Sequence, residues 1–422
     1  MLRFIGLDVH KDFCVVAISE GGKARQAGRV KTRRDELELF AQSLMPDDKV
    51  VLEATGNAFA IARVLEPHVG EVVVANPRRV RAISHAKVKS DQFDARTLAE
   101  LLAADLLDPV WIPDEQTRVL RRLSKRRLAI VVAMGRRKAH VFATLQRNLY
   151  VEPKGTDLFG TRGRAWIASL ELPSDERQTI AGDLRQFDFL AAELKVVDRE
   201  IAQISIARED IKRLMTIPGV DMITAATMVA TIGDVSRFPT SRHLIGYLGL
   251  DARVRQSGMT AARTGRISKE GSAEARRVLV EAAWSAKRVP GPLRAFGQRI
   301  QARRGSQIAT VAVARKIAVL CWHLLTRGED YAHHRPTLHR RKLRKLELRA
   351  GASSQQGKHN ANPIWETRSQ DERERDLVAQ AETSYRRSVA DWKASRPKQG
   401  TGAAPGRALD AARQDQAPDP AL

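Results

Sequence analysis

Short apolar runs and amphipathic segments alternate along the first 110 residues. The apolar runs, which are typical of β-strands, cover residues 4–9, 13–18, 27–30, 50–52 and 72–74. Segments with apolar residues at helical spacing cover residues 35–44, 57–65 and 91–107. A glycine-containing turn at 20–22 joins the second and third runs. Strands interleaved with helices predict an α/β sheet that begins with an antiparallel hairpin.

The pattern changes to long amphipathic helices after residue 112. One helix is predicted over residues 115–149 and a second over 174–215, with Pro153 and Gly155 in the loop between them. Two such helices predict an antiparallel helical pair. A hairpin packed only on itself and a spacer or oligomer contact are both consistent with this pattern.

The remaining chain divides into a helical unit and a polar tail. A helical unit rich in small residues extends to about residue 331, and a basic segment rich in Gln, Ala, Ser, Pro and Arg follows it. That composition predicts a largely disordered tail with a short helix near 366–389. The predicted divisions are 1–112, 113–212, 213–332 and 333–422.

Charge indicates the class of partner. The 422 residues include 72 Lys+Arg and 49 Asp+Glu, a net charge of +23. A chain this basic is expected to bind a polyanion, with nucleic acid ahead of an acidic membrane surface. No bilayer-spanning apolar run and no signal peptide is predicted, which favours the cell interior. Cys14 and Cys321 are the only cysteines, which excludes a disulfide framework and a cysteine-rich zinc site.

Four acids stand at the predicted strand ends and at one helix start. Asp8 lies in the first strand, Glu53 ends the fourth, and Asp91 and Asp94 share a helical face. A single acid of this kind is usually solvated or caps a helix, but several buried together require a cation. Mg²⁺ prefers oxygen ligands, and two such ions about 4 Å apart stabilise both oxygens of a phosphodiester displacement. This order of elements and acids is that of a ribonuclease H-like fold.

An actin-like ATPase or sugar kinase also begins with a G-x-D strand and a hairpin. Those proteins need a glycine-rich phosphate-binding turn directly after the first strand. Residues 10–13, His-Lys-Asp-Phe, do not form such a turn. The D-x-x-D helix also has no evident role there, so the ribonuclease H-like interpretation is favoured.

The third unit contains a tight turn between two predicted helices. Ile217, Pro218, Gly219 and Val220 match a helix-hairpin-helix element, whose turn presents backbone N–H groups to a DNA phosphate without reading sequence. Pro-Gly is also common in ordinary turns between helices. Both interpretations of Pro218 and Gly219 stay open from the sequence.

A basic, glycine-containing loop follows at residues 253–269. Arg255, Arg263, Arg266 and Lys269 are expected to hold a phosphate through charge-assisted hydrogen bonds. Ser257 lies among them, and cations or a nearby base are what make a serine nucleophilic. Most loop serines are only polar surface. Ser268 is the second candidate, and a helix is predicted to begin near residue 272.

The ordered set of motifs resembles the IS110 family of transposases, in the branch that includes Piv-type invertases. The resemblance covers residues 4–331, and the motifs in chain order are GLDVHKD (6–12), EATG (53–56), ANPRRVR (75–81), KSDQFDA (89–95), IPGV (217–220), YLGL (247–250), QSG (256–258) and GRISKEGS (265–272). Each motif alone is weak, and the ordered set is specific.

The resemblance implies a RuvC-like domain, a helical coiled-coil spacer and a small transposase domain. It implies that Asp8, Glu53, Asp91 and Asp94 hold Mg²⁺ and that Ser257 is a nucleophile that forms a phosphoserine with DNA. It further implies a homo-oligomer, dimer or tetramer, with composite sites. The implied partners are the element ends and target DNA and a structured noncoding guide RNA, in the bacterial cytoplasm at the nucleoid. No membrane partner is expected.

Two departures from the family pattern accompany the resemblance. Asn57-Ala58 replaces a Gly-Tyr-like pair after EATG, and Asp251 stands where a proline often follows YLGL. The tail after about residue 335 has no counterpart. Two alternatives stay open: a metal-only nuclease or Holliday-junction resolvase in which Ser257 is structural, and a nonenzymatic DNA-binding protein with a decayed ribonuclease H-like domain. The sequence does not distinguish a transposase from an invertase.

Overall fold

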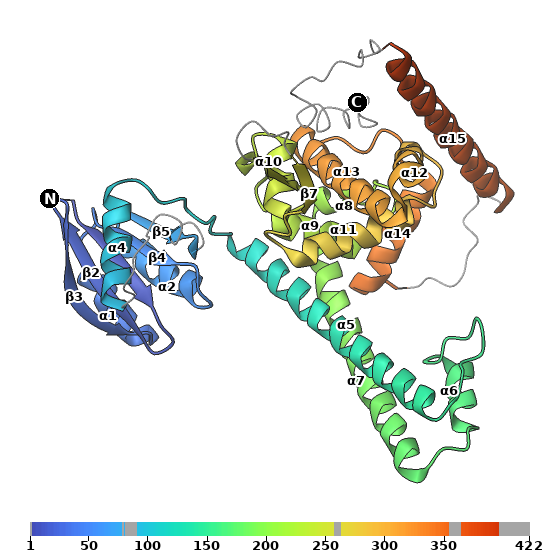
Figure 1. The fold of residues 1–422 in the computed structure, drawn as a ribbon, viewed down its shortest axis with the longest axis horizontal. Coiled ribbons are helices and arrows are strands. Elements are labelled where there is room, and N and C mark those ends of the chain that lie inside the picture. Colours follow the sequence, from blue (N-terminus) through green and yellow to red (C-terminus); the bar gives the residue numbers. More distant parts are fainter. Residues whose placement is uncertain (1, 78–79, 81–90, 257–262, 354–363, 396–422) are drawn as a thin grey trace. The chain divides into compact units, whose positions relative to one another are not determined.

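The protein forms two compact units, Met1–Asp114 and Glu115–Leu422 (Figure 1). The computed structural model describes residues 2–77, 80, 91–256, 263–353 and 364–395. The first unit is a mixed α/β layer structure and the second is mainly helical. The predicted order of an α/β sheet followed by a helical region is confirmed.

A five-stranded sheet forms the first unit, in the order β3-β2-β1-β4-β5. The strands are β1 (Phe4–Val9), β2 (Phe13–Glu20), β3 (Lys23–Lys31), β4 (Lys49–Glu53) and β5 (Glu71–Ala75). β1, β2 and β3 are antiparallel, whereas β4 and β5 are parallel to β1. The five predicted strands are confirmed. β3 is longer than the predicted 27–30. Exposed and partly buried residues alternate along this edge strand, so no continuous apolar run marks its full length in the sequence.

Helices cover both faces of this sheet. They are α1 (Arg34–Gln42), α2 (Ala58–Leu65), the short 3₁₀ helix η1 (Glu66–His68) and α4 (Asp91–Ala103). α1 and α2 share a core with Ile5, Leu7 and Leu52. α4 packs on the opposite face, against residues such as Val15 and Val51. Successive side chains of a strand point to opposite faces, so the two cores take alternate residues of the same strands.

An antiparallel helical pair begins the second unit. α5 (Glu115–Arg147) and α7 (Ser174–Ser205) lie side by side, with α6 (Thr161–Ala168) at one end (Figure 1). Ion pairs 126–193, 137–183 and 147–176 join α5 to α7 in opposite sequence directions. The predicted helix 174–215 is interrupted: α7 ends at Ser205 and α8 (Glu209–Leu214) follows an extended Arg208. No glycine or proline marks this break in the sequence.

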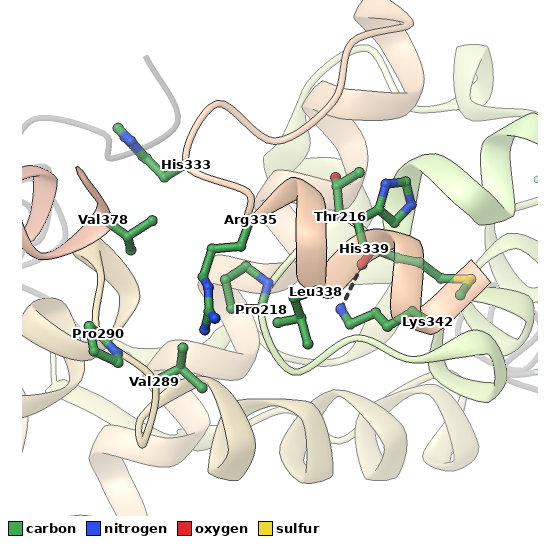
Figure 2. A pocket seen from close by; sticks show the side chains of 11 residues that line it. Thr216, Pro218, Val289, Pro290, His333, Arg335, Leu338, His339, Lys342 and Val378 are labelled. Carbon is green, nitrogen blue, oxygen red and sulfur yellow. Dashed lines mark hydrogen bonds between the residues drawn. The ribbon is translucent and has the colours of Figure 1, made fainter. Parts of the chain in front are cut away.

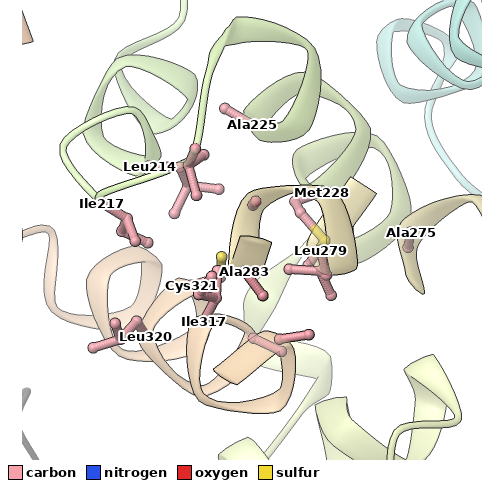
Figure 3. Packing of buried hydrophobic residues seen from close by; sticks show 14 of the residues in the cluster. Leu214, Ile217, Ala225, Met228, Ala275, Leu279, Ala283, Ile317, Leu320 and Cys321 are labelled. Carbon is pink, nitrogen blue, oxygen red and sulfur yellow. The ribbon is translucent and has the colours of Figure 1, made fainter. Parts of the chain in front are cut away.

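A helical body completes the second unit. Its elements are α9 (Met222–Ile232), the 3₁₀ helix η2 (Val235–Arg237), α10 (Ser241–Leu248), β6 (Ala252–Arg255), β7 (Arg263–Ile267), α11 (Ala273–Ala286), α12 (Pro292–Arg304) and α13 (Ser306–Arg327). Figure 3 shows its core, where Leu279 and Ile317 pack beside small residues such as Ala283. Small side chains allow the helix backbones to approach closely.

α13 is apolar enough to resemble a membrane span. Among the described residues it is the one helix that is long and apolar enough to cross a bilayer. Half of its most apolar stretch is buried within the protein. The sequence-based prediction that no such run exists is wrong by that measure. α13 contributes Val313, Ile317 and Leu320 to the core of the helical body, which accounts for its hydrophobicity.

The tail is not largely disordered over the part that the structure describes. α14 (Pro336–Ala350) and α15 (Ile364–Ala394) are helices, and Leu346, Tyr385 and Val389 belong to the core of the helical body. The prediction of disorder from residue 333 is wrong for these segments. The predicted helix near 366–389 is confirmed and is longer. The polar composition concealed α14 and the full length of α15, because their buried faces carry charged side chains.

Candidate carboxylate site and basic hairpin

The first site is built on two neighbouring parallel strands. Leu7 of β1 is the register partner of Leu52 of β4, so Asp8 and Glu53 are the next residues along adjacent strands. Leu7 and Leu52 belong to the core under α1 and α2. The alternation of strand side chains therefore places Asp8 and Glu53 on the opposite face, which α4 covers.

α4 is held unusually close to the sheet. A Cβ atom on Gly6 would lie 2.1 Å from the carbonyl oxygen of Ala95 and 2.7 Å from the backbone nitrogen of Ala99. Glycine and alanine at these points allow the helix to lie directly on β1. Ala95 also packs with Val15, the register partner of Asp8.

The D-x-x-D pair is carried by this closely packed helix. Asp94 immediately precedes Ala95, and Asp91, the first residue of α4, is one helical turn before it. Asp94 is partly buried, and the side chain of Asp91 lies outside the described residues. Backbone geometry thus brings the helix segment with both acids to the sheet face that carries Asp8 and Glu53.

A histidine that sequence reasoning passed over contacts this site. His10 Nε2 lies 3.0 Å from a carboxylate oxygen of Asp8, whose side chain is 17% exposed. The ring of His10 lies 4.8 Å from that of Phe13. The HKD sequence directly after β1 was the available signal, since a two-residue offset returns a side chain to the neighbourhood of Asp8.

Cys14 belongs to the core under α1 and α2, on the sheet face opposite Asp8 and Glu53. Burial, assisted by the charge of Asp8, raises the pKa of the Cys14 thiol to about 12. Because Cys14 lies on the other face, the groups offered beside Asp8 are carboxylates and an imidazole.

This donor chemistry fits a hard divalent cation such as Mg²⁺, which prefers oxygen ligands. Within the described side chains, no three Asp, Glu, His or Cys groups are close enough together to hold one metal ion. The structure therefore brings Asp8 and Glu53 to neighbouring strand ends and Asp94 to the covering helix, without assembling a complete ligand set from them. The metal role of Asp8, Glu53, Asp91 and Asp94 stays a prediction.

The predicted basic, glycine-containing loop is, where the structure describes it, a β-hairpin. β6 and β7 are antiparallel, and Arg255 is the register partner of Arg263. Arg255, Arg263, Arg266 and Lys269 are all exposed. Ser257 lies outside the described residues, in the segment 257–262 between the two strands. Four cations are therefore carried on the two strands and their base, next to the segment that contains Ser257.

The base of the hairpin is fixed by a network that the sequence did not indicate. The Ser268 hydroxyl donates to a carboxylate oxygen of Asp251 at 2.5 Å, and the Ser268 backbone N–H donates to the Asp251 carbonyl at 2.8 Å. Arg253 donates to the carbonyl of Ser268 at 2.9 Å. Ser268 is 8% exposed, so it is a buried structural serine here. Asp251 thus has a role in this chain that a proline could not fill.

The turn at 217–220 packs against helices α11 and α14 of the same chain. Gly219 has φ +83°, and a Cβ there would lie 2.2 Å from the carbonyl oxygen of Ala282 in α11. The ammonium of Lys342, in α14, donates to the carbonyls of Met215, Ile217 and Val220 at 2.6, 3.1 and 2.8 Å. Figure 2 shows Lys342 beside this turn and Pro218 in the lining of a small pocket. A DNA-contacting role for Pro218 and Gly219 stays a prediction.

Two family models match this chain. A transposase model of the DEDD IS110 type matches residues 5–149, and a model for the transposase IS116/IS110/IS902 family matches residues 211–298. The first range contains the four acids and the second contains the basic hairpin. α14 and α15 lie beyond both ranges.

Curated relatives agree with these models. The transposase for insertion sequence element IS1111A of Coxiella burnetii is 27% identical over 337 residues, 78% of this chain and 91% of the relative. The transposase for element IS1328 of Yersinia enterocolitica is 25% identical over 352 residues, 78% of this chain and 99% of the relative. The pilin gene-inverting protein of Moraxella bovis is 23% identical over 292 residues, 67% of this chain and 81% of the relative.

Proposed function

The chain belongs to the IS110 family of transposases and is a DNA transposase/recombinase, and from this premise we propose that it cuts and rejoins DNA with metal-bound carboxylates and a serine nucleophile. The substrates are the ends of an IS110-type insertion sequence and its target DNA. The net charge of +23 supports a polyanionic substrate.

One observation carries the proposal. Asp8, the last but one residue of β1, and Glu53, the last residue of β4, lie on the sheet face that α4 covers, and the first turn of α4 contains Asp91 and Asp94. A meander of three antiparallel strands followed by two parallel strands supports a ribonuclease H-like, RuvC-like domain at residues 1–112. The four acids form its D-E-D-D set.

The four carboxylates serve to hold the metal ion. Asp8, Glu53, Asp91 and Asp94 would hold Mg²⁺, which supplies Lewis-acid polarisation of the scissile phosphate and charge stabilisation of the leaving oxygen. Glycine at position 6 keeps α4 close enough for its acids to reach the strand ends. His10, whose Nε2 lies 3.0 Å from a carboxylate oxygen of Asp8, orients that carboxylate.

The basic hairpin supplies the nucleophile and its surroundings. The Ser257 hydroxyl oxygen attacks phosphorus, its proton leaves to a base or solvent, and the bond from phosphorus to the DNA leaving oxygen breaks. Strand exchange reverses this step with a different DNA hydroxyl. Arg255, Arg263, Arg266 and Lys269 hold the phosphate, since guanidinium groups bind phosphate oxygens with paired donors. Their exposure on β6, β7 and the hairpin base supports this role.

Assembly and guidance complete the proposal. The antiparallel pair α5–α7 serves as a coiled-coil spacer at residues 113–212, and residues 213–332 form the transposase domain, with the turn at Pro218 and Gly219 as its helix-hairpin-helix element. A homo-oligomer, dimer or tetramer, combines the two sites from different subunits. A noncoding RNA encoded by the element selects the DNA sequences, in the bacterial cytoplasm.

The test is a covalent-adduct assay. The full chain is incubated with joined element-end DNA, the flanking RNA and Mg²⁺, then denatured and examined for DNA attached to protein. The wild type and Ser388→Ala, which changes an exposed serine of α15, should both form the adduct. Ser257→Ala should form none, and Asp8→Asn should neither cleave nor form one. Equal cleavage by wild type and Ser257→Ala without any adduct would establish the metal-only nuclease or junction resolvase instead.

A further inference from the structure

The buried face of α15 is acidic, which is unusual for a helix packed on a protein body. Its inward positions recur at helical spacing, and they are Asp371, Glu374, Val378, Glu382, Tyr385 and Val389. Three of these six side chains are carboxylates. α13, by comparison, buries mainly aliphatic residues. α15 is therefore attached by a mixture of apolar contacts and buried charge pairs.

Two of the carboxylates meet the start of α14. Asp371 pairs with Arg335, whose side chain is only 12% exposed. Glu374 accepts hydrogen bonds from the Thr337 hydroxyl at 2.7 Å and from the Thr337 backbone N–H at 3.0 Å. Asp371 thus faces the guanidinium group of Arg335, and Glu374 faces an N–H donor in the first turn of α14.

The third carboxylate meets the start of α12. Glu382 is 3% exposed and accepts from the Gly291 backbone N–H at 2.9 Å and from Arg294 at 2.7 Å. Arg386 of α15 itself also donates to it, at 2.6 Å. Arginine plus a backbone N–H is the donor set that binds phosphate oxygens in nucleic-acid interfaces.

Such an attachment is less stable than an apolar one. A buried ion pair roughly balances its Coulombic attraction against the cost of desolvation, so it contributes specificity more than stability. Elements held this way open at lower free energy than an apolar core. α15 also lies beyond both ranges that match the family, so the proposed function assigns it no role.

We propose that α15 is an acidic strap that masks a second nucleic-acid-binding surface on the helical body. The masked surface consists of Arg294, Arg335 and the backbone donors of Gly291 and Thr337, and its ligand is the phosphate backbone of nucleic acid. Phosphates and the three α15 carboxylates compete for these cations. This inference does not depend on the metal-and-serine chemistry.

The test variant removes the strap's charges without shortening the chain. Asp371→Asn, Glu374→Gln and Glu382→Gln are combined in the inner variant. The matched control combines Glu372→Gln, Asp376→Asn and Asp391→Asn, three exposed acids of the same helix. Both variants lose three negative charges, so a general gain in basicity affects them equally. Binding is measured in EDTA with labelled duplex DNA and hairpin RNA of random sequence.

The inner variant should show two linked changes. Amide hydrogen exchange in α15 should become about tenfold faster than in the control, because unpaired Arg294 and Arg335 weaken the closed state. Apparent affinity should rise about threefold or more beyond the control, since binding is reduced by the fraction of closed molecules. Two additional phosphate contacts should steepen the slope of log affinity against log salt by up to about two.

Adding Arg294→Gln and Arg335→Gln to the inner variant should remove the gain in affinity. Faster exchange without tighter binding than the control, for both nucleic acids, would overturn the proposal. So would a gain that survives loss of the two arginines. A gain with duplex DNA only, or with hairpin RNA only, would support it and identify which nucleic acid uses the surface.

A reversible lock provides the converse test. Gln298 of α12 accepts a 2.7 Å hydrogen bond from Arg386 of α15, so cysteines at these positions are close enough for a short cleavable bismaleimide. Burial raises the pKa values of the native Cys14 and Cys321 thiols to about 12, which protects them from the reagent. The locked inner variant should bind no more tightly than the control and regain its affinity on cleavage. Unchanged tight binding in the locked form would also refute the strap.

Discussion

Gly6 is the residue on which the closeness of α4 to the sheet depends. Gly6→Ala would place a Cβ 2.1 Å from the Ala95 carbonyl oxygen, and backbone atoms cannot move aside as a flexible side chain can. We expect a loss of about 3 kcal/mol in unfolding free energy of the first unit, the upper part of the range for overpacking. Urea unfolding of the chain, followed by a probe in this unit, measures it.

Gly56→Ala is the matched control for that substitution. Gly56 belongs to the same unit, and a Cβ there would meet nothing within 4 Å. Its replacement should change stability by less than about 1 kcal/mol, the scale of the backbone-entropy difference between glycine and alanine. Equal effects of the two substitutions would contradict the account of the α4 contact.

Lys342 is the second residue whose chemistry gives a definite expectation. Its ammonium is the donor to three turn carbonyls, and each buried acceptor left unpaired costs about 1–3 kcal/mol. Lys342→Met should therefore destabilise the helical body by at least about 2 kcal/mol at pH 7.5. Lys393→Met, at an exposed position in α15, should be nearly neutral. Denaturant unfolding followed by a probe in the helical body compares the two.

The pH dependence of the same residue is distinctive. Burial, only partly opposed by Asp221, lowers the pKa of Lys342 from 10.5 to about 8. Between these values the unfolded chain binds the additional proton, so the unfolding free energy rises with pH from about 8 to 10.5. The rise is absent in Lys342→Met, so the stability difference between wild type and variant should widen over this window. A constant difference would mean that the lysine pKa is not lowered on folding.

The four acids could be named from the sequence because each stands at a recognisable strand end or helix start. Asp251, Ser268 and Lys342 could not be given roles in the same way. Their partners lie 17 residues apart for the first two, and more than 120 residues apart for Lys342 and the turn carbonyls. Such contacts depend on tertiary packing, which periodicity and motif spacing do not encode.

At the scale of elements, the α5–α7 pair offers a comparison between buried and exposed ion pairs. Asp183 is 4% exposed and pairs with both Arg137 and His140. Asp183→Ala removes a buried carboxylate that accepts from Arg137, and we expect a cost of about 1–3 kcal/mol, because Arg137 itself is 32% exposed. We expect faster hydrogen exchange in the turns of α5 around Arg137 and of α7 around Asp183.

Glu193→Ala on the same helix is the control. The Arg126–Glu193 pair is 48% and 36% exposed, and exposed pairs contribute about 0–1 kcal/mol. Its loss should leave exchange in the pair almost unchanged. If both variants accelerate exchange equally, burial does not determine how much each ion pair between α5 and α7 contributes to stability.

Elements were predictable where periodicity was strong. The five strands and the helices at 35–44, 91–107 and 115–149 follow from apolar spacing alone. The interruption after Ser205 was missed because no helix-breaking residue marks it. The β6–β7 hairpin was missed because both strands are short and rich in arginine, with few apolar residues. α14 and the full length of α15 were missed because buried carboxylate and ammonium groups do not register as a hydrophobic stripe.

At the scale of the whole molecule, the division at Asp114 separates two self-sufficient cores. Every buried residue in the clusters around the sheet comes from positions before 115, and the helical core begins at Leu120. A fragment of 1–114 should therefore fold alone, with a cooperative thermal transition, because folding requires no contact from the second unit. A fragment with helical and sheet signals but no cooperative transition would contradict this independence.

The same fragment isolates the carboxylates from the serine. If Asp8, Glu53, Asp91 and Asp94 form one metal site, the fragment should bind Mn²⁺, as a spectroscopic substitute for Mg²⁺, and gain thermal stability from it. Asp8→Asn should abolish that gain, whereas Asp35→Asn, which neutralises an exposed acid of α1, should preserve it. Because the fragment lacks the basic hairpin entirely, this result is independent of strand transfer. Binding that is equal in all three forms would locate the cation elsewhere and remove the metal from the proposed mechanism.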